Sequence, residues 1–293
     1  MKDLILKTAK DVNELVSGNI EDIIVSNYHP WVTSYVKYDD EDIGCGVCAA
    51  VYKGMGEEKI PLNLFKEINN LDIFGKDAYS IINEFIKKEE LLYNSIAIST
   101  LSALSYKLLS KDFLEKDGYV VNEISKIKHN LFGELIGEEG KKIVDKDDIV
   151  AIVGFAHWTF PYLKDKIKEL RCLELLDKEY FDVFSLKREK PKINVYNDPK
   201  EVLKEADVVF ITGMTILNGT LKNILKNCKN ARFKIIYGSS CSFYPKYLFN
   251  LGIDCILAMK IPNDYETKIN IIETRGYYPF LSPNTKMLMI MKR

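Results

Sequence analysis

The C-terminal half of the chain repeats one pattern, a short and continuous apolar run followed by a helical segment of about ten residues. The clearest run is IVAIVGF at residues 149–155. Continuous apolar runs are typical of strands that are buried on both faces, and strands that alternate with helices form parallel sheets. The pattern therefore predicts an α/β fold built on a doubly wound parallel sheet.

The order of the elements differs between the two halves. Strands precede helices in the first half, which is the order of α+β proteins. Its last helix, residues 91–109, is rich in Ala, Ser and Leu, and we expect it to be buried against a sheet. Residues 111–147 are charged and indicate a connector with short elements. We place the boundary near residue 145, between an α+β domain (1–145) and a Rossmann-like domain (146–293). The other expected helices are 2–16, 61–68, 75–89, 161–170, 199–206, 219–228, 245–251 and 265–274. The other expected strands are 20–26, 31–38, 43–52, 173–176, 193–196, 207–212, 233–237 and 255–259.

The composition of the chain restricts the classes of partner that it can bind. Hydrophobic residues make up 47% and charged residues 28%, which suffices for a core, and the net charge of -1 gives no field that would attract nucleic acid. No apolar run approaches the roughly 20 residues of a membrane helix, and the first residues lack the apolar segment of a signal peptide. We therefore expect a cytoplasmic protein with reduced cysteines, no membrane partner and no nucleic-acid partner. The aromatic tail at 277–281 suggests packing onto the body or a second subunit, and we expect a homodimer.

Polar loops follow three of the expected strands. In an open parallel sheet, ligands bind at the carboxyl ends of the strands, and each loop leads into a helix whose free N–H groups favour an anion or a carbonyl oxygen. The alternative is that Asn218, Thr220 and Ser242 are ordinary helix caps. Together the loops predict a small-molecule site. Its candidate residues are Gly154, Thr159, Thr212, Gly213, Thr215, Asn218, Gly219, Thr220, Gly238, Ser239 and Ser240.

The first loop, residues 154–159, departs from a dinucleotide-binding loop. It has only Gly154 of the G-x-G-x-x-G pattern, and His157 and Trp158 would crowd a pyrophosphate. Asp177 follows at the end of the next expected strand, where an acidic residue can bind a ribose hydroxyl, although a solvated turn explains it equally well. S-adenosylmethionine, which has no pyrophosphate, fits this loop better than NAD.

Two side chains in the loops are candidates for chemistry. His157 is a candidate general base or metal ligand, and a structural histidine is the alternative. Cys241 is a candidate nucleophile or metal ligand, without a readable base beside it. Cys45 and Cys48 form a CxxC, but residues three apart in a strand point to opposite faces. We therefore expect buried core cysteines there, and a bulge at Gly44 or Gly46 leaves a metal or redox site open.

The segment ITGMTILNGTL at residues 211–221 resembles a signature of the heavy-metal-chelation family, ITG-T-xx-NGT-L. The resemblance implies an enolase-N-terminal-like domain before a Rossmann-like domain, with a site between the two and a role in chelation. This chain has GFAHWTFP at 154–161 where family members tend to carry Gly-Phe-Phe-Pro-Pro, so the ligand of that loop is expected to differ. Weaker matches are residues 206–209, 238–240 with Pro245, 251–254, 44–47 and 96–104.

Two functions from different classes follow. The first is a binding or accessory protein for a metal ion, a metal chelate or a small anionic metabolite. The alternative is an S-adenosylmethionine-dependent methyltransferase in specialised cofactor biosynthesis, since methyl transfer needs chiefly proximity and orientation. The missing glycines disfavour an NAD-dependent oxidoreductase. Whether the chain is an enzyme stays open at this point.

Overall fold

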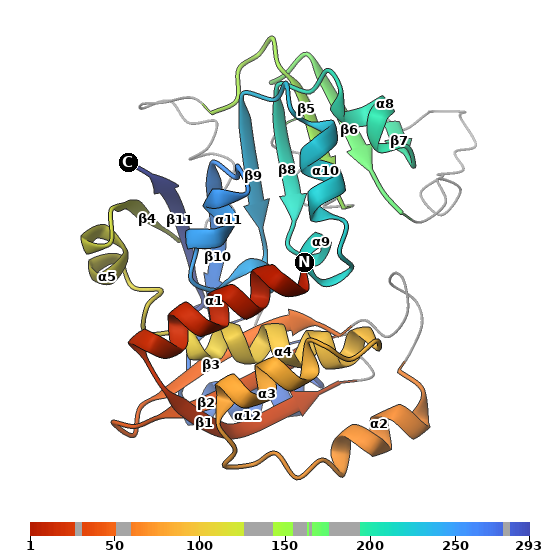
Figure 1. The fold of residues 1–293 in the computed structure, drawn as a ribbon. Helices are drawn as coiled ribbons and strands as arrows, with labels where there is room; N and C mark the ends of the chain where they lie inside the picture. Colours follow the sequence, from red (N-terminus) through yellow and green to blue (C-terminus); the bar gives the residue numbers. More distant parts are fainter. Residues whose placement is uncertain are drawn as a thin grey trace.

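Two sheets organise the chain, a three-stranded sheet of order β1-β2-β3 and an eight-stranded sheet of order β4-β11-β10-β9-β8-β5-β6-β7 (Figure 1). We call the first sheet with its helices the N-terminal unit, and the second the C-terminal unit. No helix in the part described is long and apolar enough to cross a membrane. The computed structural model describes residues 1–26, 31–50, 60–125, 143–154, 163, 166–175, 194–277 and 282–293.

The N-terminal unit has the predicted order of strands and helices. Its sheet is antiparallel throughout. The helix expected to be buried against the sheet is α4, and every residue from Leu92 to Leu104 is buried. It lies so close to β3 that a Cβ on Gly46 would stand 2.2 Å from the Ser99 carbonyl oxygen. The strands are β1 (Gly18–Val25), β2 (Trp31–Tyr38) and β3 (Ile43–Ala49), and the helices are α1 (Lys2–Leu15), α2 (Leu62–Asn69), α3 (Ala78–Phe85), α4 (Leu91–Leu104) and α5 (Lys111–Lys116).

The C-terminal unit contains the predicted parallel sheet as six of its eight strands. When these six strands are numbered by their order along the chain, they lie across the sheet in the order third, second, first, fourth, fifth, sixth. The direction of this order reverses between β5 and β8. The sheet is mixed, because β11 is antiparallel to β10 and β4 is antiparallel to β11. The strands are β4 (Tyr119–Ser125), β5 (Ile149–Val153), β6 (Glu169–Leu173), β7 (Asn194–Tyr196), β8 (Val208–Thr212), β9 (Phe233–Tyr237), β10 (Cys255–Lys260) and β11 (Lys286–Lys292).

Three expectations for this unit need correction. The sheet is not wholly parallel, because it also contains the antiparallel strands β4 and β11. Neither strand was predicted, since β4 lies in the expected connector and β11 is rich in Met rather than in β-branched residues. The helix expected at 161–170 ends too late and the strand expected at 173–176 begins too late, because residues 169–173 form β6 and pair with β5. In a short apolar run, periodicity alone cannot tell a helix from a strand. Here the pairing with β5 makes the segment a strand. The helices are α8 (Pro199–Leu203), α9 (Met214–Leu217), α10 (Leu221–Asn227), α11 (Lys246–Asn250) and α12 (Tyr265–Glu273), with a 3₁₀ turn, η4 (Ser239–Cys241).

The two units share one core. A single cluster of buried apolar residues runs from Leu4 in α1 to Ile290 in β11. Figure 1 shows α1 between α4 and α11, and at that contact Lys246 pairs with Asp11 at 2.6 Å. The large sheet also includes β4, which lies before the boundary expected near residue 145, so the division into domains remains a prediction. In the aromatic tail, Tyr277 is 41% exposed, and residues 278–281 lie outside the described residues.

Candidate functional site

The strand order reverses where β5 and β8 lie side by side, and the residues that leave these strands touch. Gly154 follows β5 with φ +85°, a conformation that side chains with a Cβ rarely adopt. A Cβ at this position would stand 2.8 Å from Cγ2 of Thr212, the last residue of β8. Ligands of open α/β sheets bind outside the carboxyl ends of the strands at this reversal. The structure therefore brings two predicted site residues together there.

The second predicted loop, residues 212–220, uses most of its polar groups to hold its own shape. Thr215 donates its hydroxyl hydrogen to the Thr212 carbonyl oxygen at 2.7 Å. The Asn218 side-chain oxygen accepts from the backbone N–H of Thr220 at 3.2 Å and from its hydroxyl at 2.7 Å. Gly219 is exposed between them. These bonds support the alternative that Asn218 and Thr220 shape the turn before α10. Thr212 is partly exposed, and its hydroxyl oxygen accepts the Met214 N–H at 3.4 Å, which leaves the hydroxyl hydrogen to donate to a ligand.

The third predicted loop begins at Gly238 and turns inward. Ser239 and Ser240 are 5% and 3% exposed. The Ser240 hydroxyl oxygen accepts the Ala49 N–H at 3.3 Å and the Cys48 thiol at 3.4 Å, and both of these residues belong to the end of β3. Ser240 thus joins the two units. The third loop also packs closely against the second loop, since a Cβ on Gly213 would stand 2.9 Å from the Cys241 backbone nitrogen.

The thiols near this edge are protonated at neutral pH. Cys241 is fully buried and donates to the Gly238 carbonyl oxygen at 3.1 Å, and burial raises the pKa of its thiol. Burial likewise raises the pKa of Cys48 to about 12. Metals bind the thiolate form, so the surroundings of Cys241 favour packing over metal binding. Among the described residues, no group of three or more His, Cys, Asp or Glu side chains could hold a metal ion.

Cys45 and Cys48 point to opposite faces of the small sheet, as expected for a strand. Cys45 packs with Tyr35 and Val47 against Ile261. Cys48 belongs to the core cluster shared by the two units. Both residues are buried and free, which fits the interpretation as core cysteines.

Three predicted site residues lie outside the described residues: His157, Thr159 and Asp177. The roles suggested for His157 as a base or ligand, and for Asp177 as a ribose contact, therefore remain predictions.

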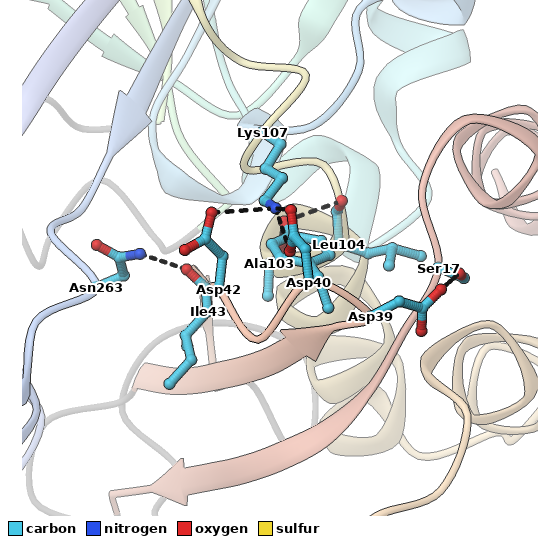
Figure 2. Close-up of polar contacts among 10 residues, drawn as sticks. Ser17, Asp39, Asp40, Asp42, Ile43, Ala103, Leu104, Lys107 and Asn263 are labelled. Atoms are coloured by element: carbon cyan, nitrogen blue, oxygen red, sulfur yellow. Dashed lines mark hydrogen bonds and ion pairs between the residues drawn. The ribbon is translucent and has the colours of Figure 1, made fainter.

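A polar network closes the other end of the small sheet, at the turn between β2 and β3 (Figure 2). Lys107 lies between Asp40 and Asp42, with Asp42 at 3.1 Å, and Tyr38 donates to the Ala103 carbonyl oxygen at 2.7 Å. The hydrogen bond from Lys107 lowers the pKa of Asp40. Asn263, from the C-terminal unit, donates to the Ile43 carbonyl oxygen. These contacts fix the turn to the end of α4 and to the other unit, and their exposed ion pairs contribute little energy.

Sequence reasoning missed a cavity of about 500 Å³ at the carboxyl end of β10. Lys260, the last residue of β10, donates to the Leu109 carbonyl oxygen at 3.1 Å, and its ammonium nitrogen lies 4.3 Å from the centre of the Tyr106 ring. A lysine directly after an apolar strand was a visible signal. The other walls come from residues far away in the sequence, and no local pattern connects them.

Comparison with known proteins assigns the chain to a family. The DUF364 family profile, described as "Putative heavy-metal chelation", matches residues 142–290. An "Uncharacterized protein" of Methanocaldococcus jannaschii is 30% identical over 146 residues, which are 48% of this chain and 52% of that relative. The match thus spans about half the length of the relative.

Two solved structures share the whole fold. A DUF364-family protein from Pyrococcus horikoshii has a TM-score of 0.67 at 16% identity, covering 100% of this chain and 99% of its own. One from Desulfitobacterium hafniense has a TM-score of 0.62 at 15% identity, covering 99% and 98%. Both are described as proteins with unknown function, and identities this low show similarity of fold alone.

Proposed function

The chain belongs to the DUF364 family, and on that premise we propose that it binds a metal chelate or a small anionic metabolite at the carboxyl ends of β5 and β8. The N-terminal unit, which we propose to be enolase-N-terminal-like, would wall the site from the side of β3. The C-terminal unit would be Rossmann-like, since its six parallel strands follow the order of dinucleotide-binding sheets.

One observation carries this proposal, the contact of Gly154 with Thr212 at the reversal of the strand order. Gly154 lets the two strand ends approach closely, and the partly exposed Thr212 lies at the same edge, where its hydroxyl accepts the Met214 N–H and can donate to a ligand. Cys48 and Cys241 stay protonated. A metal would therefore be recognised together with its own ligands, as a chelate.

The test has two steps. Native mass spectrometry and elemental analysis of the protein as isolated would reveal a co-purifying chelate or anion. Titration with Ni²⁺ alone and with its EDTA complex would then separate binding of a bare ion from binding of a chelate. We expect the complex to bind, and Thr212→Val to weaken it about fivefold through the loss of one hydrogen bond.

Thr274→Val is the matched control, since Thr274 lies at the end of α12 and its hydroxyl bonds to the Asn270 carbonyl oxygen. It should leave binding unchanged. A protein that carries no bound species and binds neither probe would overturn the proposal. The same spectra give the oligomeric state, for which we propose a homodimer.

The second candidate is a methyltransferase that uses S-adenosylmethionine. The strand order favours it, because sheets of this order bind nucleoside-bearing ligands at the reversal. A stoichiometric adduct with S-adenosylhomocysteine would support this candidate and make Asp177 and His157 the first residues to replace. The absence of an adduct at millimolar S-adenosylhomocysteine would exclude this candidate.

A further inference from the structure

We propose that the cavity at the carboxyl end of β10 is a second binding site, for a small molecule that carries a carboxylate or phosphate group, with the Lys260 ammonium group as its charge partner. This site is separate from the edge formed by β5 and β8.

The cavity lies between the two units. Its volume of about 500 Å³ falls within the range of small-molecule sites. One wall is the α4–α5 connection and the start of α5, including Tyr106 and Ser110, and the other is formed by the ends of β10, β11 and β4. A ligand here would touch both units. The remaining lining residues include Glu123, Asn263, Asp264, Asn284 and Lys286.

Lys260 is a half-buried cation whose charge is only partly offset within the described structure. Its ammonium group has three N–H donors, of which the Leu109 carbonyl oxygen accepts one. The face of the Tyr106 ring covers another side. Among the described residues, no carboxylate lies within ion-pair distance of this group. Partial burial, and then the nearby Lys286, lowers the pKa of Lys260, while Glu123 raises it to a smaller extent. An anion in the cavity would act in the same direction as Glu123 and offset the effects of burial and Lys286.

The carboxylates that line the cavity are mostly engaged elsewhere. Glu123 pairs with Lys286 at 3.2 Å. Asp264 caps α12, accepting from the backbone N–H of Thr267 at 2.8 Å and from its hydroxyl at 2.9 Å. Asp112 is exposed at the start of α5, next to the exposed Lys111. None of these carboxylates is paired with Lys260, so an anionic ligand would be its direct charge partner.

The η4 turn separates this cavity from the edge of β5 and β8. Ser242, just after η4, donates its hydroxyl hydrogen to the Gly238 carbonyl oxygen at 3.0 Å and accepts the Met259 N–H at 2.8 Å. The turn is thereby fixed to the end of β10. Because different residues form the two sites, Thr212→Val tests one and Lys260→Met tests the other.

The experiment is calorimetric titration of the full chain with inorganic phosphate and, separately, with citrate, which tells a phosphate ligand from a carboxylate ligand. We expect at least one to bind. Lys260→Met should weaken that binding about tenfold or more, and Lys260→Arg should retain most of it. Lys246→Met, which removes a lysine paired with Asp11 outside the cavity, and Thr212→Val should have no effect.

A second measurement needs no variant. Brief acetylation of the wild-type chain, read by peptide mass spectrometry, should show Lys260 protected by the bound probe and Lys246 unprotected. Failure of both probes to bind, or equal loss of binding in Lys246→Met and Lys260→Met, would overturn the proposal. Equal acetylation of Lys260 with and without a bound probe would also overturn it.

Discussion

Most hydroxyl, amide and thiol groups of the loops after β8 and β9 form hydrogen bonds within the protein. Ser240 links its loop to β3, Asn218 holds a turn, and Cys241 donates to the carbonyl group of its own loop. Buried polar groups are costly unless they are hydrogen-bonded, so the bonds of Ser240 and Cys241 stabilise the fold whatever the protein binds. Thr212 differs in degree, because it is partly exposed at the strand edge, although its hydroxyl oxygen accepts the Met214 N–H at 3.4 Å.

Ser240→Ala should destabilise the protein. The substitution leaves the Ala49 N–H without its acceptor in a buried contact between the units, which costs about 1–3 kcal/mol in the free energy of unfolding. Urea denaturation measures this change. Ser17→Ala is the control, since the Ser17 hydroxyl bonds to Asp39 at an exposed position, and it should change stability little. Equal stability of the two variants would contradict the role given to Ser240.

Alkaline pH should weaken the fold because buried thiols resist ionisation. Burial raises the pKa of Cys45 and Cys48 from the ordinary value of 9.0 to about 12. Above the ordinary value the unfolded chain has lost these protons while the folded chain keeps them, so the free energy of unfolding falls as pH rises toward the folded pKa.

Urea denaturation at several pH values between about 8 and 11 would show this fall. Cys48→Ala should start from lower stability, because it leaves a small cavity, but should lose less stability per pH unit than the wild type. A pH slope that is identical in the two proteins would argue against the buried-thiol explanation.

Close approaches between elements depend on glycine. Gly46 lets α4 lie against β3, and Gly154 lets the ends of β5 and β8 meet. The first contact packs the N-terminal unit, whereas the second shapes the proposed site. Neither approach is visible in the sequence, where a glycine in an apolar strand is equally consistent with a bulge.

Gly154→Ala should be more destabilising than Gly118→Ala. Both glycines have positive φ, +85° and +92°, which costs about 1–2 kcal/mol for a residue with a Cβ. A Cβ on Gly118 meets open space, while one on Gly154 meets the Thr212 methyl group at 2.8 Å. Adding Thr212→Ser to Gly154→Ala removes that methyl group and should restore part of the loss. Thermal and urea unfolding of the four proteins test this, and no restoration would exclude the steric explanation.

The whole molecule should unfold as one cooperative body. One apolar core crosses both units, and the large sheet takes its edge strand β4 from the segment that follows directly on the N-terminal unit. We expect a single calorimetric transition whose measured and van't Hoff enthalpies agree. Two resolved transitions would show that the units fold independently and would support the domain division expected near residue 145.

Local patterns predicted most elements of this chain and the edge of the sheet at which the proposed site lies. The continuous apolar runs gave five of the six parallel strands close to their observed positions, and the helix boundaries differ by a few residues. The ends of β5, β8 and β9, at Gly154, Thr212 and Gly238, lie at one edge of the sheet as expected, because the carboxyl ends of parallel strands meet there. Which polar groups would be free at that edge was not predictable, since Ser240 is bound by a residue 192 positions away in the sequence.

The sequence by itself therefore determined the α/β alternation, the three consecutive strands of the small sheet and the edge at which the strand ends gather, because these depend on periodicity and residue type over short windows. Only the tertiary structure decided the two antiparallel strands β4 and β11, the inward turn of Ser240 and the cavity beside Lys260. Lys260 and its Leu109 acceptor are 151 positions apart. Such contacts depend on how distant segments dock, and a local sequence pattern carries no information about the partner that a hydrogen-bonding group will meet.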